Sequence, residues 1–179
     1  YKLIILYGCL LNTFSSVFGQ TQATAYDNQV FLKWNNFILE IDRYAAGFRP
    51  CPGGSSLAYM GLAAYESVVH GMPQNNSLRK QFPDLKLPLA TPNAEYFHPA
   101  AVNECYDYIM HYYFDYLATK RPVEFAKIEK TYQDYRKTYA GRIPLNILAR
   151  SEAFGKATAK AICEWEARDI VGHNAHLNP

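Results

Sequence analysis

The chain has 179 residues, of which 49% are hydrophobic and 19% are charged, and this composition excludes a disordered or low-complexity protein. Its length suits one domain of ordinary size. The formal net charge is only +2, which is too small to indicate a nucleic-acid-binding protein.

The first 25 residues have the composition of a secretory signal peptide. Lys2 precedes a short apolar run over 3–11, small residues follow near Gly19, and no acidic residue occurs before Asp27. The run is too short for a membrane span, which needs roughly 20 apolar residues. We therefore expect residues 1–25 to be a signal peptide and residues 26–179 to be a helical domain, with the protein exported to the periplasm or secreted. A hydrophobic start to the domain itself is the alternative.

The four residues that end at Cys9, Leu-Tyr-Gly-Cys, also resemble a lipoprotein cleavage box. Apolar residues continue after Cys9, so lipidation is the weaker interpretation. If the signal is removed, Cys51, Cys105 and Cys163 remain, and an odd count indicates a free thiol or a partner outside this sequence. Cys105 and Cys163 lie on apolar helical faces, which favours small core residues.

From residue 26 onward the hydrophobic pattern predicts an all-α helical bundle without strands. We expect five helices, over 27–45, 53–70, 98–119, 122–140 and 145–170. Two prolines make 49–52 a rigid link between the first two helices. A long irregular segment with four prolines, 73–97, follows the second helix, and its apolar residues indicate that it packs on the core.

Apolar residues at steps of three and four define the inward face of each helix. The predicted core positions of four helices are Val30, Trp34, Phe37, Ile38 and Ile41; Val102, Cys105, Tyr106, Ile109, Met110, Tyr113 and Leu117; Phe125, Ile128, Tyr132, Tyr135 and Tyr139; and Ile147, Leu148, Phe154, Ala161, Ile162 and Trp165.

The second helix is apolar nearly all round, which is typical of a buried helix. It is rich in glycine and alanine, so neighbouring helices could approach it closely. If the domain is half of a larger bundle, this helix should leave an apolar patch exposed. Its Glu66 should be at least partly buried and must then be paired, and Arg49 is the expected partner in a structural ion pair.

Charge is distributed unevenly over the second half of the chain. Residues 87–119 contain four acids and no Lys or Arg, whereas residues 120–160 contain ten Lys or Arg and four acids. We expect the third helix to pack beside the fourth and fifth with complementary charge. A basic docking surface for an anionic ligand is the alternative.

Few patterns in the sequence indicate chemistry, since P-loop, GxGxxG, GxSxG and HExxH motifs are absent. Glu95 and His98 have the ExxH spacing of di-metal bundles, but those sites need two such motifs. Glu104, Tyr108, His111 and Asp115 share one side of the third helix, which we interpret as a solvated polar face.

The tail contains His173 and His176 without a third ligand nearby. We assign no residue a catalytic, cofactor-binding or metal-binding role. A metal-binding helical protein that uses Glu95, His98, His111 or the tail histidines is kept as an alternative.

One stretch carries a family resemblance. Residues 42–54, DRYAAGFRPCPGG, run into LAYMGLAAYESVV at 57–69 and GMP at 71–73. This resembles the N-terminal helical region of bacterial vanadium-dependent haloperoxidase-like proteins, which belong to the type 2 phosphatidic acid phosphatase superfamily. The tail at 172–179, GHNAHLNP, resembles the stretch that leads into the second half of such proteins.

The resemblance implies an all-helical bundle that binds vanadate, or phosphate as substrate. The family's anion site uses a Lys followed seven residues later by Arg-Pro, then Pro-Ser-Gly-His, then Ser-Arg with a distant His. Arg-Pro occurs here at Arg49 and Arg121, but Asp42 and Phe114 stand seven residues earlier, and the other two motifs are absent. No catalytic residue or cofactor is therefore carried over to this chain.

The resemblance thus implies the N-terminal structural portion of a longer exported enzyme, haloperoxidase-like or acid-phosphatase-like. Its expected partner is the C-terminal catalytic half, which would hold the oxyanion, and this chain alone is expected to be inactive. Neither nucleic acid nor a stable membrane span is expected, and a homo-oligomer remains open. A free-standing, non-catalytic helical binding or scaffold module is the alternative function.

Overall fold

A computed structural model describes residues 28–48 and 51–169, and this part of the chain is built from helices without strands, which confirms the all-α prediction. The six α-helices are α1 (Gln29–Ile41), α2 (Cys51–Val68), α3 (His98–Phe114), α4 (Leu117–Lys120), α5 (Pro122–Tyr139) and α6 (Leu145–Glu166). Three short 3-10 helices are η2 (Asp42–Tyr44), η3 (Val69–Gly71) and η4 (Leu78–Lys80). The predicted signal peptide, Arg49 and the tail histidines lie outside the described residues.

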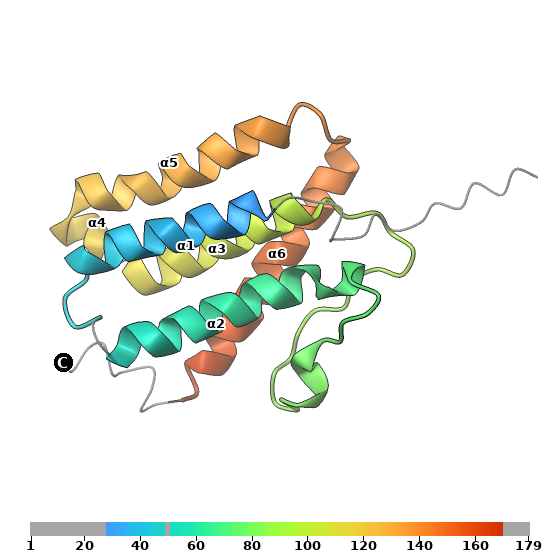
Figure 1. The fold of residues 1–179 in the computed structure, drawn as a ribbon, viewed down its shortest axis with the longest axis horizontal. Coiled ribbons are helices and arrows are strands. Elements are labelled where there is room, and N and C mark those ends of the chain that lie inside the picture. Colours follow the sequence, from blue (N-terminus) through green and yellow to red (C-terminus); the bar gives the residue numbers. More distant parts are fainter. Residues whose placement is uncertain (1–27, 49–50, 170–179) are drawn as a thin grey trace, which may run out of the picture.

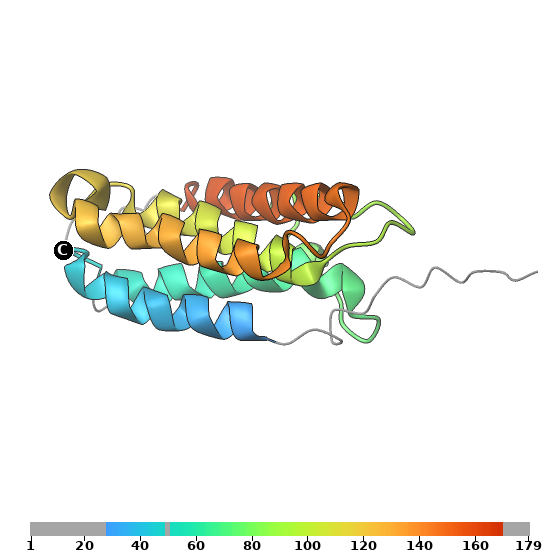
Figure 2. The same ribbon diagram turned by 90° about the horizontal axis from the view of Figure 1, so that it is seen from above.

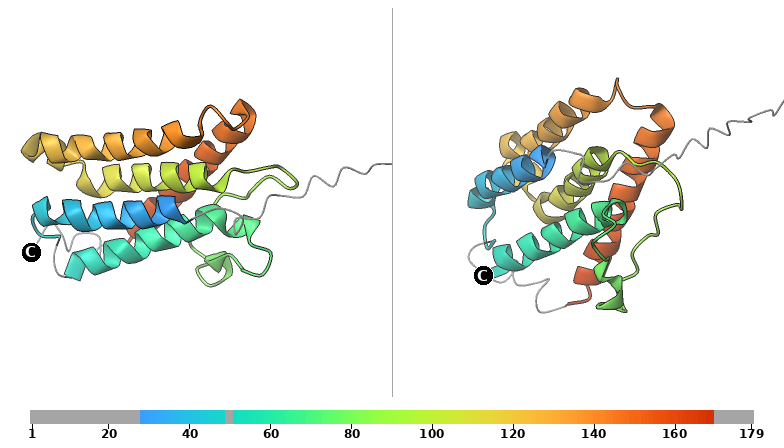
Figure 3. Two further views of the ribbon diagram at one scale, coloured as in Figure 1. Left: turned by 45° about the horizontal axis from the view of Figure 1, so that its top comes forward. Right: turned by 45° about the vertical axis from the view of Figure 1, so that its right-hand side comes forward.

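Helix α3 is the centre of the bundle, and α1, α2, α5 and α6 all pack on it. The axes of helices α1, α2, α3 and α5 are roughly parallel, while α6 crosses them diagonally (Figure 1). Seen from above, α1 and α6 lie on opposite sides with α3 between them (Figure 2). The irregular segment between η3 and α3 loops out beyond one end of α2 and returns along the bundle (Figure 3).

Helix boundaries differ from the predictions at several places, and α6, predicted to run to residue 170, ends at Glu166. The first helix ends at Ile41 and continues as η2, and Gly47, at φ 78°, has the left-handed backbone expected of a helix-ending glycine. Cys51 and Pro52, predicted as part of the link, begin α2, because proline is favoured in the first turn of a helix. The predicted third helix is broken after Phe114, and no glycine or proline marks the break.

The core consists largely of the predicted residues. Every predicted core position of α1 is buried, as is the whole predicted stripe of α3 with Leu117 of α4. Ile128, Tyr135 and Tyr139 of α5 are buried, whereas Phe125 and Tyr132 are half-buried at the edge of the core. Apolar periodicity found these faces because each helix buries one stripe against α3.

Helix α2 is not buried on all sides, and that prediction is wrong. Met60, Ala63 and Ala64 face the core, but Gly54 and Ala58 are exposed and the Leu57 side chain is 37% exposed. A Cβ atom added at Gly54 or Gly61 would meet nothing within 4 Å. The close helix crossing lies instead at Gly155 of α6, which packs directly on the backbone of Ala101 in α3.

Within the described part of the chain, none of the helices combines the length and apolar character that crossing a membrane requires.

Candidate functional site

The candidate site is an open cavity of about 450 Å³ beside the C-terminal end of α2. One wall is formed by Glu66 of α2 and His70 of the following η3. Arg79 of η4 in the irregular segment and Phe154 of α6 also line the cavity. Most of the remaining lining is apolar or amide: Val69, Met72, Pro73, Asn75, Asn76, Leu87, Pro88, Leu89 and Ala90. A cavity with a few convergent polar groups on apolar walls is the usual form of a small-molecule site.

Glu66 fastens the irregular segment to α2. Its side chain is only 4% exposed, and its two carboxylate oxygens accept hydrogen bonds from Ser77 Oγ at 2.7 Å and from the backbone N–H of Leu78 at 2.6 Å. The predicted burial of Glu66 is confirmed, and the observed partners of its carboxylate are neutral loop donors, whereas the predicted ion pair with Arg49 lies outside the described residues. Both of these donors come from the loop that follows α2. The two hydrogen bonds therefore satisfy the buried carboxylate and also hold the loop against α2.

Arg79 continues this contact along the same loop. Its Nε donates to Ser77 Oγ at 3.3 Å, and its Nη2 donates to the carbonyl oxygen of Pro88 at 2.8 Å. Ser77 also accepts the backbone N–H of Arg79 and so caps η4. The Ser77 hydroxyl is thereby fully engaged in holding the loop, and the arrangement is a structural latch rather than an activated nucleophile.

His70 lies at the base of the cavity, among aromatic rings. Its ring centroid lies 4.7 Å from that of Tyr96, 5.0 Å from that of His98 and 4.8 Å from that of Phe154. Burial, with the neighbouring His98 as a second cause, lowers the pKa of His70 to about 4. Among the described residues neither ring nitrogen has a hydrogen-bond partner. His70 is therefore a neutral imidazole at pH 7 that could donate one hydrogen bond and accept another.

The predicted Glu95–His98 pair is not brought together as metal ligands. Glu95 is exposed and its backbone carbonyl accepts a hydrogen bond from Arg150, whereas His98 is buried against His70. No group of three or more potential ligand side chains that could hold a metal ion occurs among residues 28–48 and 51–169.

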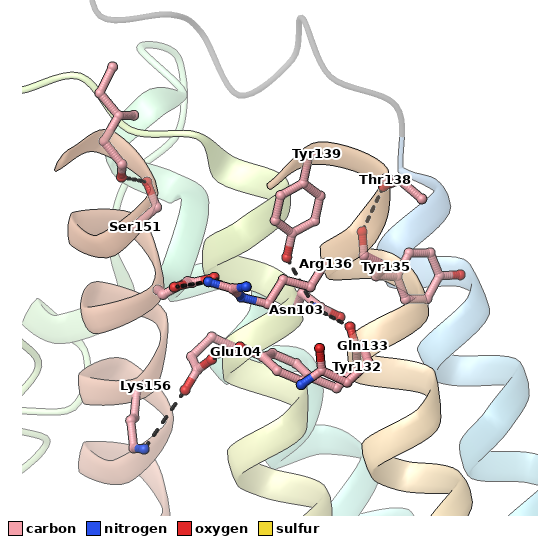
Figure 4. Close-up of polar contacts among 12 residues, drawn as sticks. Asn103, Glu104, Tyr132, Gln133, Tyr135, Arg136, Thr138, Tyr139, Ser151 and Lys156 are labelled. Atoms are coloured by element: carbon pink, nitrogen blue, oxygen red, sulfur yellow. Dashed lines mark hydrogen bonds and ion pairs between the residues drawn. The ribbon is translucent and has the colours of Figure 1, made fainter. Parts of the chain in front are cut away.

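Glu104 is not on a solvated face, and that prediction is wrong. Figure 4 shows Glu104 of α3 between Tyr132 of α5 and Lys156 of α6. Tyr132 donates to its carboxylate at 2.8 Å, and the Lys156 ammonium lies 3.8 Å away. Arg136 of α5 pairs with Glu152 of α6 at 2.8 Å beside them. The expected charge complementarity between α3 and the basic helices is present at Glu104.

Asp107, one turn further along α3, was not singled out by the sequence. Its Oδ1 is buried without a hydrogen bond in the described structure and lies 3.5 Å from Nδ1 of His111. Burial raises the pKa of Asp107 to about 6, with Glu104 and Glu129 adding to the shift and His111 and Lys156 opposing it. Asp115, which was predicted on the same face, is exposed.

Asn103 joins three helices at the centre of the bundle. Its Oδ1 accepts from Trp34 Nε1 of α1 at 2.9 Å. Its Nδ2 donates to Tyr139 Oη and to the carbonyl oxygen of Tyr132 in α5, each at 3.1 Å, and Figure 4 shows Asn103 beside these two residues. The side chain is fully buried. It is a structural hub, because each of its polar atoms is satisfied by protein groups.

Cys105 and Cys163 are both buried and free, which confirms them as core residues. Burial raises the pKa of Cys163 to about 12 and that of Cys105 well above its ordinary value. These thiols are therefore protonated and unreactive at pH 7.

The sequence indicated Glu66 but not its partners, Ser77 and the backbone N–H of Leu78. It also gave no indication of His70 or Asp107 as notable residues. The cluster of Asn75, Asn76, Ser77 and Arg79 in a proline-rich loop was an available signal, because buried carboxylates are commonly satisfied by nearby loop donors. No family model matches the chain, and comparisons with curated proteins and with solved structures also gave no match.

Proposed function

We propose that this chain is the N-terminal structural portion of an exported vanadium-dependent haloperoxidase-like or acid-phosphatase-like protein. The oxyanion site, for vanadate or phosphate, lies in the C-terminal half, and the present domain packs against the catalytic helices and shapes the entrance to that site. The N-terminal 25 residues direct export.

The supporting observation is the structure of the motif that carries the family resemblance. Gly53 N–H donates to the carbonyl oxygen of Phe48 at 2.6 Å, and an added Cβ at Gly53 would lie 2.9 Å from the same oxygen. Glycine is therefore required where the chain turns from η2 into α2. The motif thus forms a close-packed connection between η2 and α2. A packing role of this kind supports a structural rather than a catalytic function for this part of the protein.

The contacts of three arginines support the same assignment of a structural role to this chain and of the oxyanion site to the C-terminal half. A multiply charged oxyanion needs clustered Arg or Lys donors and a histidine at its apical oxygen. Arg79 is bonded to loop carbonyls, Arg136 to Glu152 and Arg150 to the backbone of Glu95. The donors for an anion would then come from the downstream helices.

The test is vanadate binding, followed by ⁵¹V NMR, to this chain and to the longer protein read from the same frame beyond Pro179. We expect the longer protein to bind vanadate in competition with phosphate and this chain alone to leave the vanadate signal unchanged. A stop codon directly after Pro179 would contradict the proposal, as would stoichiometric vanadate binding by the present chain.

A further inference from the structure

The polar side chains that line the cavity beside the end of α2 have partners, with one exception. The Glu66 carboxylate accepts two hydrogen bonds from the loop, and the Arg79 guanidinium donates to a loop hydroxyl and to a loop carbonyl oxygen. The hydroxyl of Thr158 donates to a backbone carbonyl oxygen within α6 at 2.9 Å. Asn75 and Asn76 are exposed, so water reaches them. These groups are therefore satisfied without a ligand.

His70 is the exception. It lines the cavity, and both of its ring nitrogens are buried without a hydrogen-bond partner in the described structure. The rings of Tyr96 and Phe154 pack edge-on to the imidazole and hold it in place, but they supply it with neither a donor nor an acceptor. Buried polar groups without a partner are costly and rare in native proteins. His70 therefore requires a partner from outside the chain.

The other walls of the cavity favour a ligand with an apolar body. The cavity measures about 450 Å³, which is within the range of small-molecule sites, about 300–1,000 Å³. Leu89 lines it although its side chain is 78% exposed, so this leucine offers apolar contact that the protein itself does not use. The further apolar lining residues are Val69, Met72, Leu87, Pro88 and Ala90.

The charges of the cavity favour an uncharged ligand. Glu66 and Arg79 are the two charged residues of its lining, and they have opposite sign. Both are already hydrogen-bonded to the loop, so an ion that entered would lose its hydration without gaining a counter-charge of its own. Burial lowers the pKa of His70 to about 4, so the imidazole adds no charge at pH 7.

We propose that this cavity binds a small uncharged alcohol, with its apolar body against the apolar walls and its hydroxyl on the ring of His70. A hydroxyl suits a neutral imidazole because it both donates and accepts, and so serves either ring nitrogen. A ketone or an ether only accepts, and a hydrocarbon leaves the imidazole unsatisfied. This site is independent of the oxyanion site proposed for the C-terminal half.

The experiment titrates three probes with the same ring, cyclohexanol, cyclohexane and cyclohexanecarboxylate, into this chain at pH 7. Binding is followed by NMR of the protein labelled with ¹⁵N at its histidine rings. We expect cyclohexanol to shift the ring resonances of His70 and to leave those of His111, a half-exposed residue of α3, unchanged. Cyclohexanecarboxylate should bind at least about tenfold more weakly than cyclohexanol, because its charge finds no partner in the cavity.

The variant that tests the hydroxyl contact is His70→Phe, which keeps a ring but has no donor or acceptor. Its preference for cyclohexanol over cyclohexane should fall at least about tenfold below that of the unaltered protein, since a site built to bond a hydroxyl discriminates strongly against its absence. Comparing the two probes within each protein cancels the cost of removing the hydroxyl from water. His70→Gln, which retains a donor and an acceptor, should preserve most of the preference, and His111→Phe should preserve all of it.

A second pair of variants tests the apolar wall at positions where folding is not at stake. Leu89→Ser should weaken the binding of cyclohexanol and cyclohexane alike, by about threefold or more, because apolar contact is lost at an exposed position. Leu145→Ser is the matched control, since Leu145 is 79% exposed at the start of α6 and does not line the cavity. It should leave the binding of both probes unchanged.

Three results would overturn the proposal. If none of the probes binds, water alone serves the nitrogens of His70. If cyclohexanecarboxylate binds more tightly than cyclohexanol, the cavity is an anion site that uses Arg79. If a folded His70→Phe variant, verified by circular dichroism, keeps the full preference for cyclohexanol, the hydroxyl does not contact His70. Should His70→Phe fail to fold, His70→Gln and the ¹⁵N shifts of the unaltered protein decide the same question.

Discussion

Gly155 of α6 packs on the backbone of Ala101 in α3 so closely that an added Cβ would lie 2.7 Å from the Ala101 carbonyl carbon. Real Cβ atoms essentially never approach backbone atoms to this distance, and neither helix can give way as a flexible side chain could. We expect Gly155→Ala to lower the free energy of unfolding by about 2 kcal/mol or more, as overpacking a core does. Urea denaturation followed by circular dichroism measures the loss.

The matched control for that substitution is Gly61→Ala in α2. The new Cβ meets nothing within 4 Å, and alanine is the better helix former. Its free energy of unfolding should rise by up to about 1 kcal/mol. Equal effects of the two substitutions would show that α3 and α6 do not cross as closely as described.

Asn103→Leu should destabilise the bundle at its centre. The substitution leaves the buried Trp34 Nε1–H without its acceptor and removes the donor to Tyr139 Oη, since Asn103 bonds both. The expected loss is about 3 kcal/mol, because each buried polar group left unsatisfied costs about 1–3 kcal/mol. Asn146→Leu, at an exposed position of α6, is the control and should change the free energy of unfolding by less than about 0.5 kcal/mol.

The sequence predicted those features of the fold that depend on the pattern within a single helix, such as which of its residues are buried. Trp34 and Ile128 were placed in the core because burial against α3 is periodic along each helix. Glu104 was misplaced because helical spacing shows which residues share a side but not which neighbouring helix covers that side. The contact at Gly155 depends on where α6 crosses α3, and the partners of Glu66 depend on the path of a loop, so neither follows from local periodicity.

The latch at Glu66 gives a prediction about the loop that follows α2. Glu66→Ala removes the acceptor for both Ser77 Oγ and the Leu78 N–H, which should cost about 2 kcal/mol and release the loop. Trypsin should then cut after Lys80 and Lys86, both exposed, faster than in the unaltered protein. Glu66→Gln should have the smaller effect, because its amide oxygen can still accept from Leu78.

The control for the latch is Glu164→Ala. Glu164 is exposed and pairs with Lys160 at 3.7 Å on the surface of α6, where an ion pair contributes less than about 0.5 kcal/mol. Trypsin cleavage after Lys80 and Lys86 should be unchanged in this variant. If Glu66→Ala and Glu164→Ala were cleaved alike, Glu66 would not hold the loop.

His70 and Asp107 should make stability depend on pH in opposite directions. The pKa of His70 is lowered from 6.5 to about 4, so between these pH values the unfolded chain binds the proton and the folded protein does not. Stability from this residue is therefore lost as the pH falls from 6.5 to 4. The pKa of Asp107 is raised from 3.8 to about 6, so the folded protein binds the extra proton and gains stability as the pH falls through nearly the same window.

Two variants separate these titrations. His70→Phe keeps a ring among Tyr96 and Phe154 but cannot be protonated, so its free energy of unfolding should fall less between pH 6.5 and 4 than that of the unaltered protein. Asp107→Asn removes the group that opposes this loss, so the free energy of unfolding of that variant should fall more over the same pH range. Each difference from the unaltered protein should be on the order of 1 kcal/mol. Urea denaturation at pH 4.5, 5.5 and 7 measures all three proteins. Identical pH profiles for the two variants would contradict the environments described for both residues, because the physical argument requires changes of opposite sign.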